Sequence, residues 1–157
     1  MAQPAKPHII VLGIGNTLRR DDGTGIRVIQ EFWKKEEKSG ISFVDGGTSP
    51  DLLSLLDPNI EKLVIVDALR GGKVPGYIYR LEMDESHISE QATESLHGLG
   101  VLDGLKMMKM LGTQPRKVVL IGLEPSDTSH GLQLSPLIES RLPDLIGAVE
   151  NEIKPPY

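Results

Sequence analysis

Short, continuous runs of aliphatic residues alternate along this chain with stretches in which apolar residues recur at helical spacing. The runs expected to form strands are Ile9–Leu12, Ser42–Asp45, Leu63–Asp67, Tyr77–Leu81 and Val118–Leu123. Continuous apolar runs are typical of parallel strands whose two faces are both covered by helices. Because strand–helix units are joined by right-handed crossovers, the alternation predicts a doubly wound α/β sheet with helices on both faces.

One connection is too short for a helical crossover. Only nine residues separate Leu63–Asp67 from Tyr77–Leu81, and they include Gly71–Gly72 and Pro75–Gly76. A parallel crossover requires a dozen or more residues. We therefore expect Tyr77–Leu81 to run antiparallel to the strand before it.

Helices are expected between the strands, where apolar residues return every three or four positions. The first is expected to begin at Thr24 and to be closed by Gly40. A second, short helix is expected at Ser49–Asp51, where a capping serine precedes a proline at the first helical position and an acid in the first turn.

Two longer helices are expected in the second half of the chain. The segment Leu99–Leu111 offers to the core Leu102, Leu105, Met108 and Met110. The other helix begins at Ser135–Pro136 and runs to about Ile153. We expect Pro143 to kink or split it, because proline removes a helical hydrogen bond.

Length and composition exclude several classes of protein. The 157 residues contain no linker or repeat, so we expect residues 1–157 to form a single domain. A net charge of −5 without a basic run argues against nucleic acid as a partner. No segment approaches the ~18–20 apolar residues needed to span a bilayer, and the chain start lacks a secretory pattern, so we expect a cytoplasmic protein. The absence of cysteine excludes disulfides, thiolate metal sites and cysteine nucleophiles.

Polar side chains follow the ends of the predicted strands, where an open parallel sheet binds its ligands. They are Asn16, Asp21, Asp22, Asp45, Asp67 and Glu124. We expect these carboxylates, with no matching Lys or Arg at those positions, to repel one another unless they are protonated or bridged by a cation. Two aspartates and the neutral His97, at the start of a helix, could supply three ligands to a divalent transition metal and leave one position open.

Each of these residues also has a purely structural explanation. Asp22 could cap the helix that follows it, and backbone amides of the next loop could satisfy Asp67. His97 could be a surface or hydrogen-bonded histidine, and Asp45 could organise a turn before Gly46–Gly47. The residue pattern alone leaves these alternatives open.

Nucleotide and serine-hydrolase motifs are incomplete. Gly13–Ile14–Gly15 lies where a dinucleotide-binding fingerprint would begin, but Leu18 occupies the place of its third glycine. Asp21–Asp22 would also repel a pyrophosphate. The chain has neither the Gly-Lys-Ser/Thr of a P-loop nor a GxSxG elbow.

The segment GIGNTLRRDDGTG, Gly13–Gly25, resembles the signature of the hydrogenase maturation endopeptidases, the proteases that process the large subunit of nickel–iron hydrogenases. The resemblance continues in order along the chain with DGGT at Asp45–Thr48, VDA at Val66–Ala68, HGLG at His97–Gly100, VVLIGLEP at Val118–Pro125 and LSP at Leu134–Pro136. It implies a three-layer fold with a twisted five-stranded sheet between helices.

The implied activity is that of an aspartic-type endopeptidase, which removes a C-terminal peptide from the large-subunit precursor after nickel has been inserted. By position in the motifs, Asp22, Asp67 and His97 take the places of the metal ligands and catalytic residues. Asp45 takes a place linked to substrate recognition, and we group with it Gly46, Gly47, Thr48 and Asn16.

The implied metal is nickel supplied by the substrate, and zinc or cadmium could occupy the same site. A non-catalytic, nickel-sensing maturation chaperone and a Rossmann-type nucleotide-binding module remain as alternatives. Four scattered histidines without a His-rich tract argue against autonomous metal storage.

Overall fold

Five strands form one sheet in the order β2-β1-β3-β5-β4. The structure, a computed structural model, describes residues 8–83 and 100–155. Its elements in chain order are β1 (Ile9–Gly13), the 3-10 helix η1 (Arg20–Gly23), α1 (Thr24–Trp33), β2 (Ile41–Asp45), α2 (Leu52–Leu55), β3 (Lys62–Ala68), β4 (Ile78–Glu82), α4 (Gly100–Met110), β5 (Lys117–Leu123) and α5 (Pro136–Glu152).

Four of the strands are parallel and the fifth is antiparallel. β1 lies between β2 and β3, and β3 pairs with β5, all in parallel register. β4 runs antiparallel at the edge, which confirms the direction expected for this segment. Its partner is β5, which lies between β3 and β4 in the sheet.

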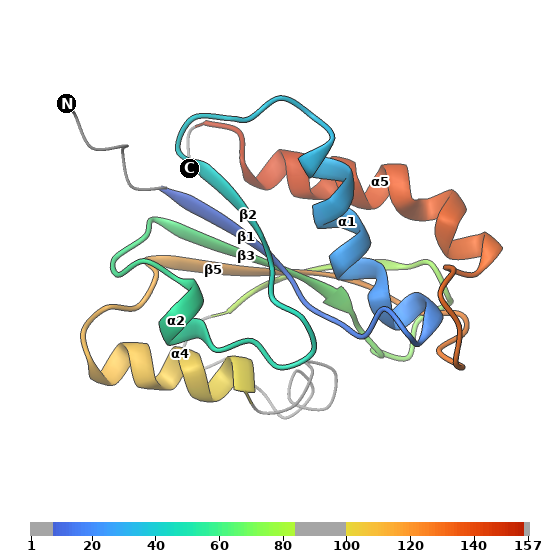
Figure 1. Cartoon of the computed structure of the whole chain (residues 1–157), viewed down its shortest axis with the longest axis horizontal. Helices are drawn as coiled ribbons and strands as arrows, with labels where there is room; N and C mark the ends of the chain where they lie inside the picture. The colour runs from blue at the N-terminus through green and yellow to red at the C-terminus, as the bar shows by residue number, and fades with distance from the viewer. Residues whose placement is uncertain (1–7, 84–99, 156–157) are drawn as a thin grey trace.

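Helices cover both faces of the sheet, as Figure 1 shows. Alternate side chains of a strand point to opposite faces, so Val64 and Val66 of β3 pack under α1 and α5, while Leu63 and Ile65 pack under α2 and α4. All four are fully buried, and each contributes about 1.5–3 kcal/mol of hydrophobic stabilisation. The predicted three-layer α/β fold is confirmed.

The first helix is shorter than expected. α1 ends at Trp33, whereas the sequence predicted an end at Gly40. Residues 34–39 are charged or polar and all exposed, so they offer no apolar face that would extend the helix over the sheet. Gly40 instead has a φ of 78°, and its carbonyl accepts hydrogen bonds from the backbone N–H groups of His8 and Ile9 at the start of β1.

Three details of the other helices differ from the predictions. The N-cap of α2 is Asp51, two residues beyond the predicted serine. Met110 is 82% exposed because it lies at the end of α4, beyond the turn that packs on the sheet. Pro143 does not split α5. Proline has no N–H group to donate to the carbonyl of Glu139, four residues earlier, but both residues are exposed, so this carbonyl is not buried without a partner.

Within residues 8–83 and 100–155, no helix combines the length and apolar character required to cross a membrane.

Candidate functional site

A cavity of about 430 Å³ lies beyond the carboxyl ends of the parallel strands. Its lining residues are Asn16, Arg19, Asp22, Thr48, Arg70 and Thr128. They come from the segments that follow β1, β2, β3 and β5, which the parallel topology brings to the same edge of the sheet. Asn16, Asp22 and Thr48 were predicted to lie together, and the structure brings them together.

Backbone hydrogen bonds join the loops after β1 and β2. The N–H of Gly15 donates to the carbonyl of Gly47 over 3.0 Å, and the N–H of Gly46 donates to the carbonyl of Gly13 over 2.8 Å. Gly15 has a φ of 148°, and a Cβ there would overlap the backbone carbonyl of Asp22. Glycine is therefore required at position 15 because the loop folds back on η1.

Asp22 is half-buried and belongs to the cavity. Its Oδ2 accepts a hydrogen bond from the backbone N–H of Asn16 over 3.2 Å. The N-cap of α1 is Gly23, and no side chain caps that helix, so the explanation of Asp22 as a helix cap is wrong. η1, which carries Asp22, packs against β3.

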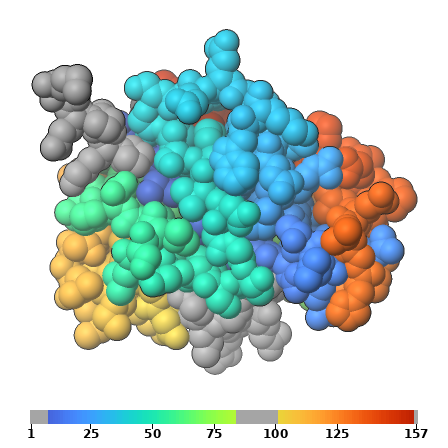
Figure 2. Space-filling model, in the orientation of Figure 1, coloured from blue at the N-terminus to red at the C-terminus, as the bar shows by residue number. Residues whose placement is uncertain are grey.

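The neighbouring Asp21 is fully buried and faces away from the cavity. It accepts hydrogen bonds of 2.7–2.9 Å from the backbone N–H groups of Ser126, Asp127 and Ser135 and from the Ser135 hydroxyl. These bonds fasten the segment after β5 to the segment after β1, which lie side by side in blue and orange in Figure 2. Asp21 is thus a structural anchor.

Asp67 lies at the carboxyl end of β3 and is fully buried. Strand alternation places it on the same face as Leu63 and Ile65, the face that α4 covers. His97, three residues before α4, lies outside the described residues. Among the residues that the structure does describe, no three His, Asp or Glu side chains gather closely enough to hold a metal ion. The three-ligand set that includes His97 therefore stays a prediction.

Asp45 is exposed, and its Oδ1 accepts a hydrogen bond from the backbone N–H of Gly47 over 2.8 Å. This bond closes a local turn, which is the structural explanation that the sequence left open. The turn places Thr48 at the cavity, while Asp45 itself is not part of the lining.

Glu124 supports the loop after β3. Its buried Oε1 accepts hydrogen bonds from the backbone N–H of Gly71 over 3.1 Å and from the Tyr79 hydroxyl over 2.9 Å. Burial, with the hydrogen bond to Glu124, raises the pKa of Tyr79. Glu124 therefore holds the turn beside Arg70 and does not line the cavity.

Three cavity residues, Arg19, Arg70 and Thr128, were not predicted from the sequence. The expectation of carboxylates without matching cations was wrong, because two arginines line the cavity with Asp22. The available signal was their position: Arg19 lies in the loop after β1, and Arg70 comes three residues after Asp67.

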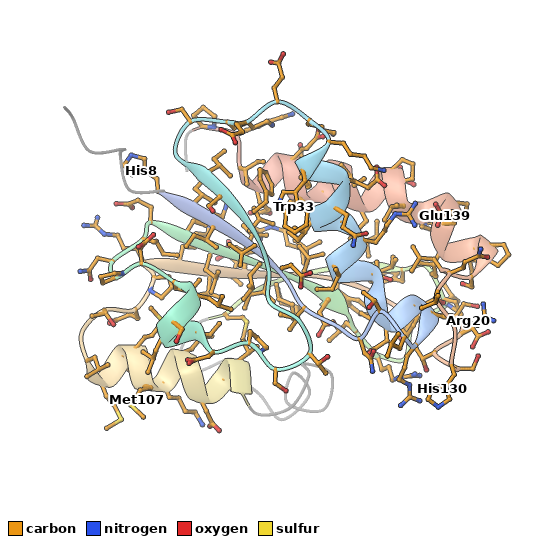
Figure 3. The ribbon with its side chains drawn as sticks, in the orientation of Figure 1. His8, Arg20, Trp33, Met107, His130 and Glu139 are labelled. Carbon is orange, nitrogen blue, oxygen red and sulfur yellow. The ribbon has the colours of Figure 1, made fainter. Side chains whose placement is uncertain are left out.

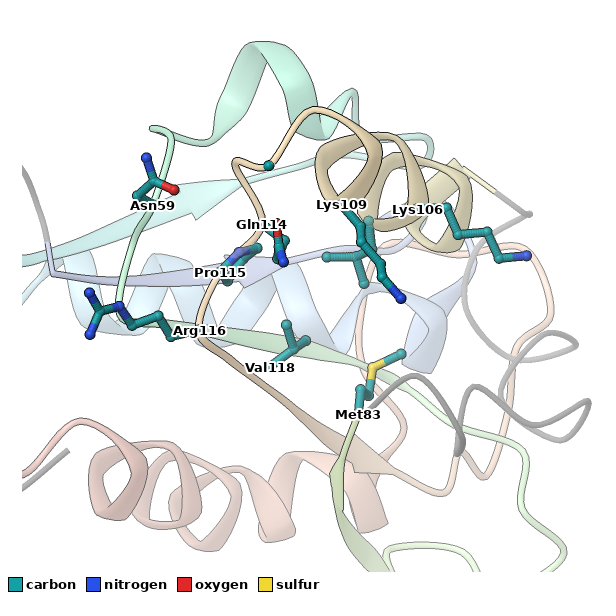
Figure 4. A pocket seen from close by; sticks show the side chains of 10 residues that line it. Asn59, Met83, Lys106, Lys109, Gln114, Pro115, Arg116 and Val118 are labelled. Carbon is teal, nitrogen blue, oxygen red and sulfur yellow. The ribbon is translucent and has the colours of Figure 1, made fainter.

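A second cavity, of about 600 Å³, opens at the other end of the parallel strands, where they begin. It lies between the end of α4 and the start of β5 (Figure 4). Lys106, Lys109 and Arg116 line it above the apolar side chains of Leu105 and Val118. It contains no residue of the predicted site. Size alone therefore does not identify the functional cavity.

A family model and individual relatives both show similarity to proteins of hydrogenase maturation or formation. Residues 26–152 match a family described as hydrogenase maturation protease. The chain is 36% identical over 141 residues to the hydrogenase expression/formation protein HupD of Thiocapsa roseopersicina, and 35% identical over 129 residues to HupD of Rhizobium leguminosarum bv. viciae. These alignments cover 87% and 81% of this chain, but only 63% and 64% of the relatives.

A solved structure shares the whole fold. It is the hydrogenase maturating endopeptidase HybD from E. coli, which is 28% identical, with a TM-score of 0.79. The superposition covers 92% of this chain and 91% of that one.

Proposed function

Because the chain belongs to the hydrogenase maturation protease family, we propose that it is an endopeptidase that removes a C-terminal peptide from the nickel-loaded precursor of a nickel–iron hydrogenase large subunit. The geometry that carries this proposal is the cavity at the carboxyl edge of the sheet, where Asp22 lies beside Asn16 and Thr48. Four segments distant in the sequence, those after β1, β2, β3 and β5, contribute side chains to this one cavity.

In this proposal, Asp22, Asp67 and His97 hold the nickel ion that the precursor carries. A divalent ion polarises a carbonyl or lowers the pKa of a bound water. Asp22 is half-buried and borders the cavity, so its carboxylate can also take a proton from water as a general base. Asp67 is suited to be a metal ligand, because a cation compensates the cost of burying its carboxylate. Zinc or cadmium would compete for the same ligands.

The turn at Asp45–Thr48 is proposed to recognise the precursor. Thr48 lines the cavity, and the hydrogen bond between Gly15 and Gly47 fixes this turn to the loop that carries Asn16. Asp45 is exposed beside it and is therefore available to a protein partner.

Mass spectrometry of the precursor tests the proposed function. A substoichiometric amount of this protein is incubated with the nickel-loaded and the nickel-free large-subunit precursor. We expect one C-terminal peptide to be lost from the loaded form only, because the nickel ion is part of the recognised substrate. An unchanged precursor mass together with a stable complex would contradict proteolysis and indicate a non-catalytic chaperone.

A further inference from the structure

Two arginines of the cavity have no role in the chemistry described above. Arg19 follows β1 and Arg70 follows β3, yet both contact the same residue. Arg19 Nε donates a hydrogen bond to the backbone carbonyl of Thr128 over 3.1 Å, and Arg70 Nη2 donates to the Thr128 hydroxyl. One threonine thus orients two guanidinium groups at the cavity that Asp22 borders.

The segment that carries Thr128 is itself held firmly. Asp21 accepts hydrogen bonds from Ser126 and Asp127, and the backbone N–H of Gly131 donates to the carbonyl of Leu18 over 2.9 Å. Figure 3 shows Arg20 and His130, from the two joined segments, close together at this end of the molecule. Because the loop is fixed before any ligand binds, the two arginines need little further ordering to bind one.

The charge of the cavity differs from that of the whole protein. Its lining contains two arginines against one aspartate, whereas the chain carries a net charge of −5. Arg19 forms no ion pair of 4.0 Å or less with a carboxylate of the described residues, while Arg27 and Arg141, elsewhere on the surface, do so. Guanidinium groups at a cavity of an acidic protein attract an anionic group.

We propose that Arg19 and Arg70 form a carboxylate-binding subsite for the peptide substrate. The inference rests on the proposed function, which supplies the peptide. A guanidinium group is planar and matches the two oxygens of a carboxylate with two parallel hydrogen bonds. Arg19 and Arg70 are specificity and positioning residues in this scheme, and Thr128 positions both.

A peptide can bring a carboxylate to this subsite from two sources. One is an acidic side chain near the scissile bond. The other is created by the reaction: the water oxygen bonds to the carbonyl carbon, the C–N bond breaks, and both protons of the water pass to the leaving nitrogen, so that the new chain ends are a carboxylate and an ammonium. The first source would favour substrate binding and the second would favour product binding.

Two isomeric probes separate these sources. N-acetylisoglutamine carries only a side-chain carboxylate, and N-acetylglutamine carries only a terminal one. Each is titrated into ¹⁵N-labelled protein while the Nε–Hε resonances of Arg19 and Arg70 are followed by NMR. We expect saturable shifts of both resonances with one probe, and about tenfold weaker binding in Arg19→Gln and Arg70→Gln. Arg116→Gln is the control, since it removes an equal charge from the opposite edge of the sheet.

The role of Thr128 is tested in the same way. Thr128→Ser keeps the hydroxyl and the carbonyl, and it should bind the preferred probe as the wild type does. Thr128→Val removes the hydroxyl that accepts from Arg70, so it should weaken binding and move the Arg70 resonance in the free protein. Unchanged thermal unfolding of both variants would separate positioning from misfolding.

Processing kinetics complete the test. For a side-chain source, Arg19→Gln and Arg70→Gln should raise KM about tenfold at an unchanged kcat, and for a terminal source they should weaken product inhibition. Shifted resonances in a protein that cuts no precursor would refute the proposed function and leave the subsite standing. If neither probe shifts either resonance up to its solubility limit, and both variants process the precursor as Arg116→Gln does, the subsite is refuted.

Discussion

At the scale of single residues, Asp21 and Asp22 are adjacent in the chain and have opposite surroundings. Asp21 is fully buried and accepts hydrogen bonds from Ser126, Asp127 and Ser135. Asp22 borders the cavity, and its Oδ2 accepts a hydrogen bond from the backbone N–H of Asn16. One carboxylate therefore serves stability, and its neighbour lies at the cavity where we propose the chemistry.

The substitution Asp22→Asn should abolish processing and leave the fold intact. An amide carries no charge to hold a cation and is not a useful base at neutral pH, so we expect at least about a 10²-fold loss of activity. The free energy of unfolding should change by less than about 1 kcal/mol, because the amide oxygen still accepts from Asn16. Activity is measured as the initial rate of peptide release. A rate near that of the wild type would contradict both roles of Asp22.

The substitution Asp21→Asn should instead destabilise the protein by about 2–4 kcal/mol. The NH₂ group of asparagine cannot accept the hydrogen bonds that one carboxylate oxygen now receives, and both Ser135 donors to Asp21 are buried. Urea unfolding measures the loss. The matched control is Asp127→Asn in the segment after β5 that Asp21 holds, an exposed site where the cost should stay below about 1 kcal/mol. Equal effects of the two substitutions would show that Asp21 is not an anchor.

At the scale of elements, an ion-pair network around the buried Lys62 and Glu152 fastens the end of α5 to the sheet. Glu152 of α5 accepts hydrogen bonds from Lys62 Nζ of β3, over 2.7 Å, and from Arg80 of β4. Lys62 also donates to the backbone carbonyl of Glu152 over 2.8 Å, which satisfies the end of the helix. Burial raises the pKa of Glu152, but the hydrogen bonds from Arg80 and Lys62 outweigh it, and the net pKa is lowered.

This network predicts a pH-dependent component of stability. Since the folded-state pKa of Glu152 lies below the unfolded value of about 4.3, its contribution is present above that pH and is lost as the pH falls through the folded-state pKa. Glu152→Gln should cost about 3–5 kcal/mol at pH 7, because Lys62 is left buried without a counter-charge. Unfolding at several pH values should show a smaller difference between wild type and variant in acid. A difference independent of pH would refute the assignment.

At the scale of the whole molecule, the site exists only where four loops meet. The parallel order brings the segments after β1, β2, β3 and β5 to one edge, while β4 runs the other way. Helices on both faces make the interior of the sheet inaccessible, so this edge is where polar side chains can gather. The larger cationic cavity lies at the other edge and shares none of them.

The close contact between the loop after β1 and η1 can be tested at Gly15. An added Cβ would overlap the backbone carbonyl of Asp22, so Gly15→Ala should displace η1 and lower both activity and stability, the latter by about 2 kcal/mol or more. Gly72→Ala is the control, because Gly72 also has a positive φ but no neighbouring atom would meet its Cβ. Thermal unfolding and peptide release are measured together. Equal behaviour of the two variants would contradict a specific role of the close contact.

The strands, the direction of β4 and the segments that carry Asn16, Asp22 and Thr48 could all be predicted from the sequence. These features follow from local patterns of apolar residues, glycines and loop length, which act over a few neighbouring positions. Local patterns predicted too great a length for α1, because a helix ends where its apolar face no longer packs against the sheet.

Which polar residues share a cavity follows from the tertiary structure and not from the sequence pattern. The tertiary structure separated Asp21 from Asp22, assigned Glu124 to the support of a turn, and added Arg19 and Arg70 to the site. The physical reason is that contacts between loops depend on the order of the strands and on the path of each backbone. Residues that meet through such contacts have no fixed spacing in the chain.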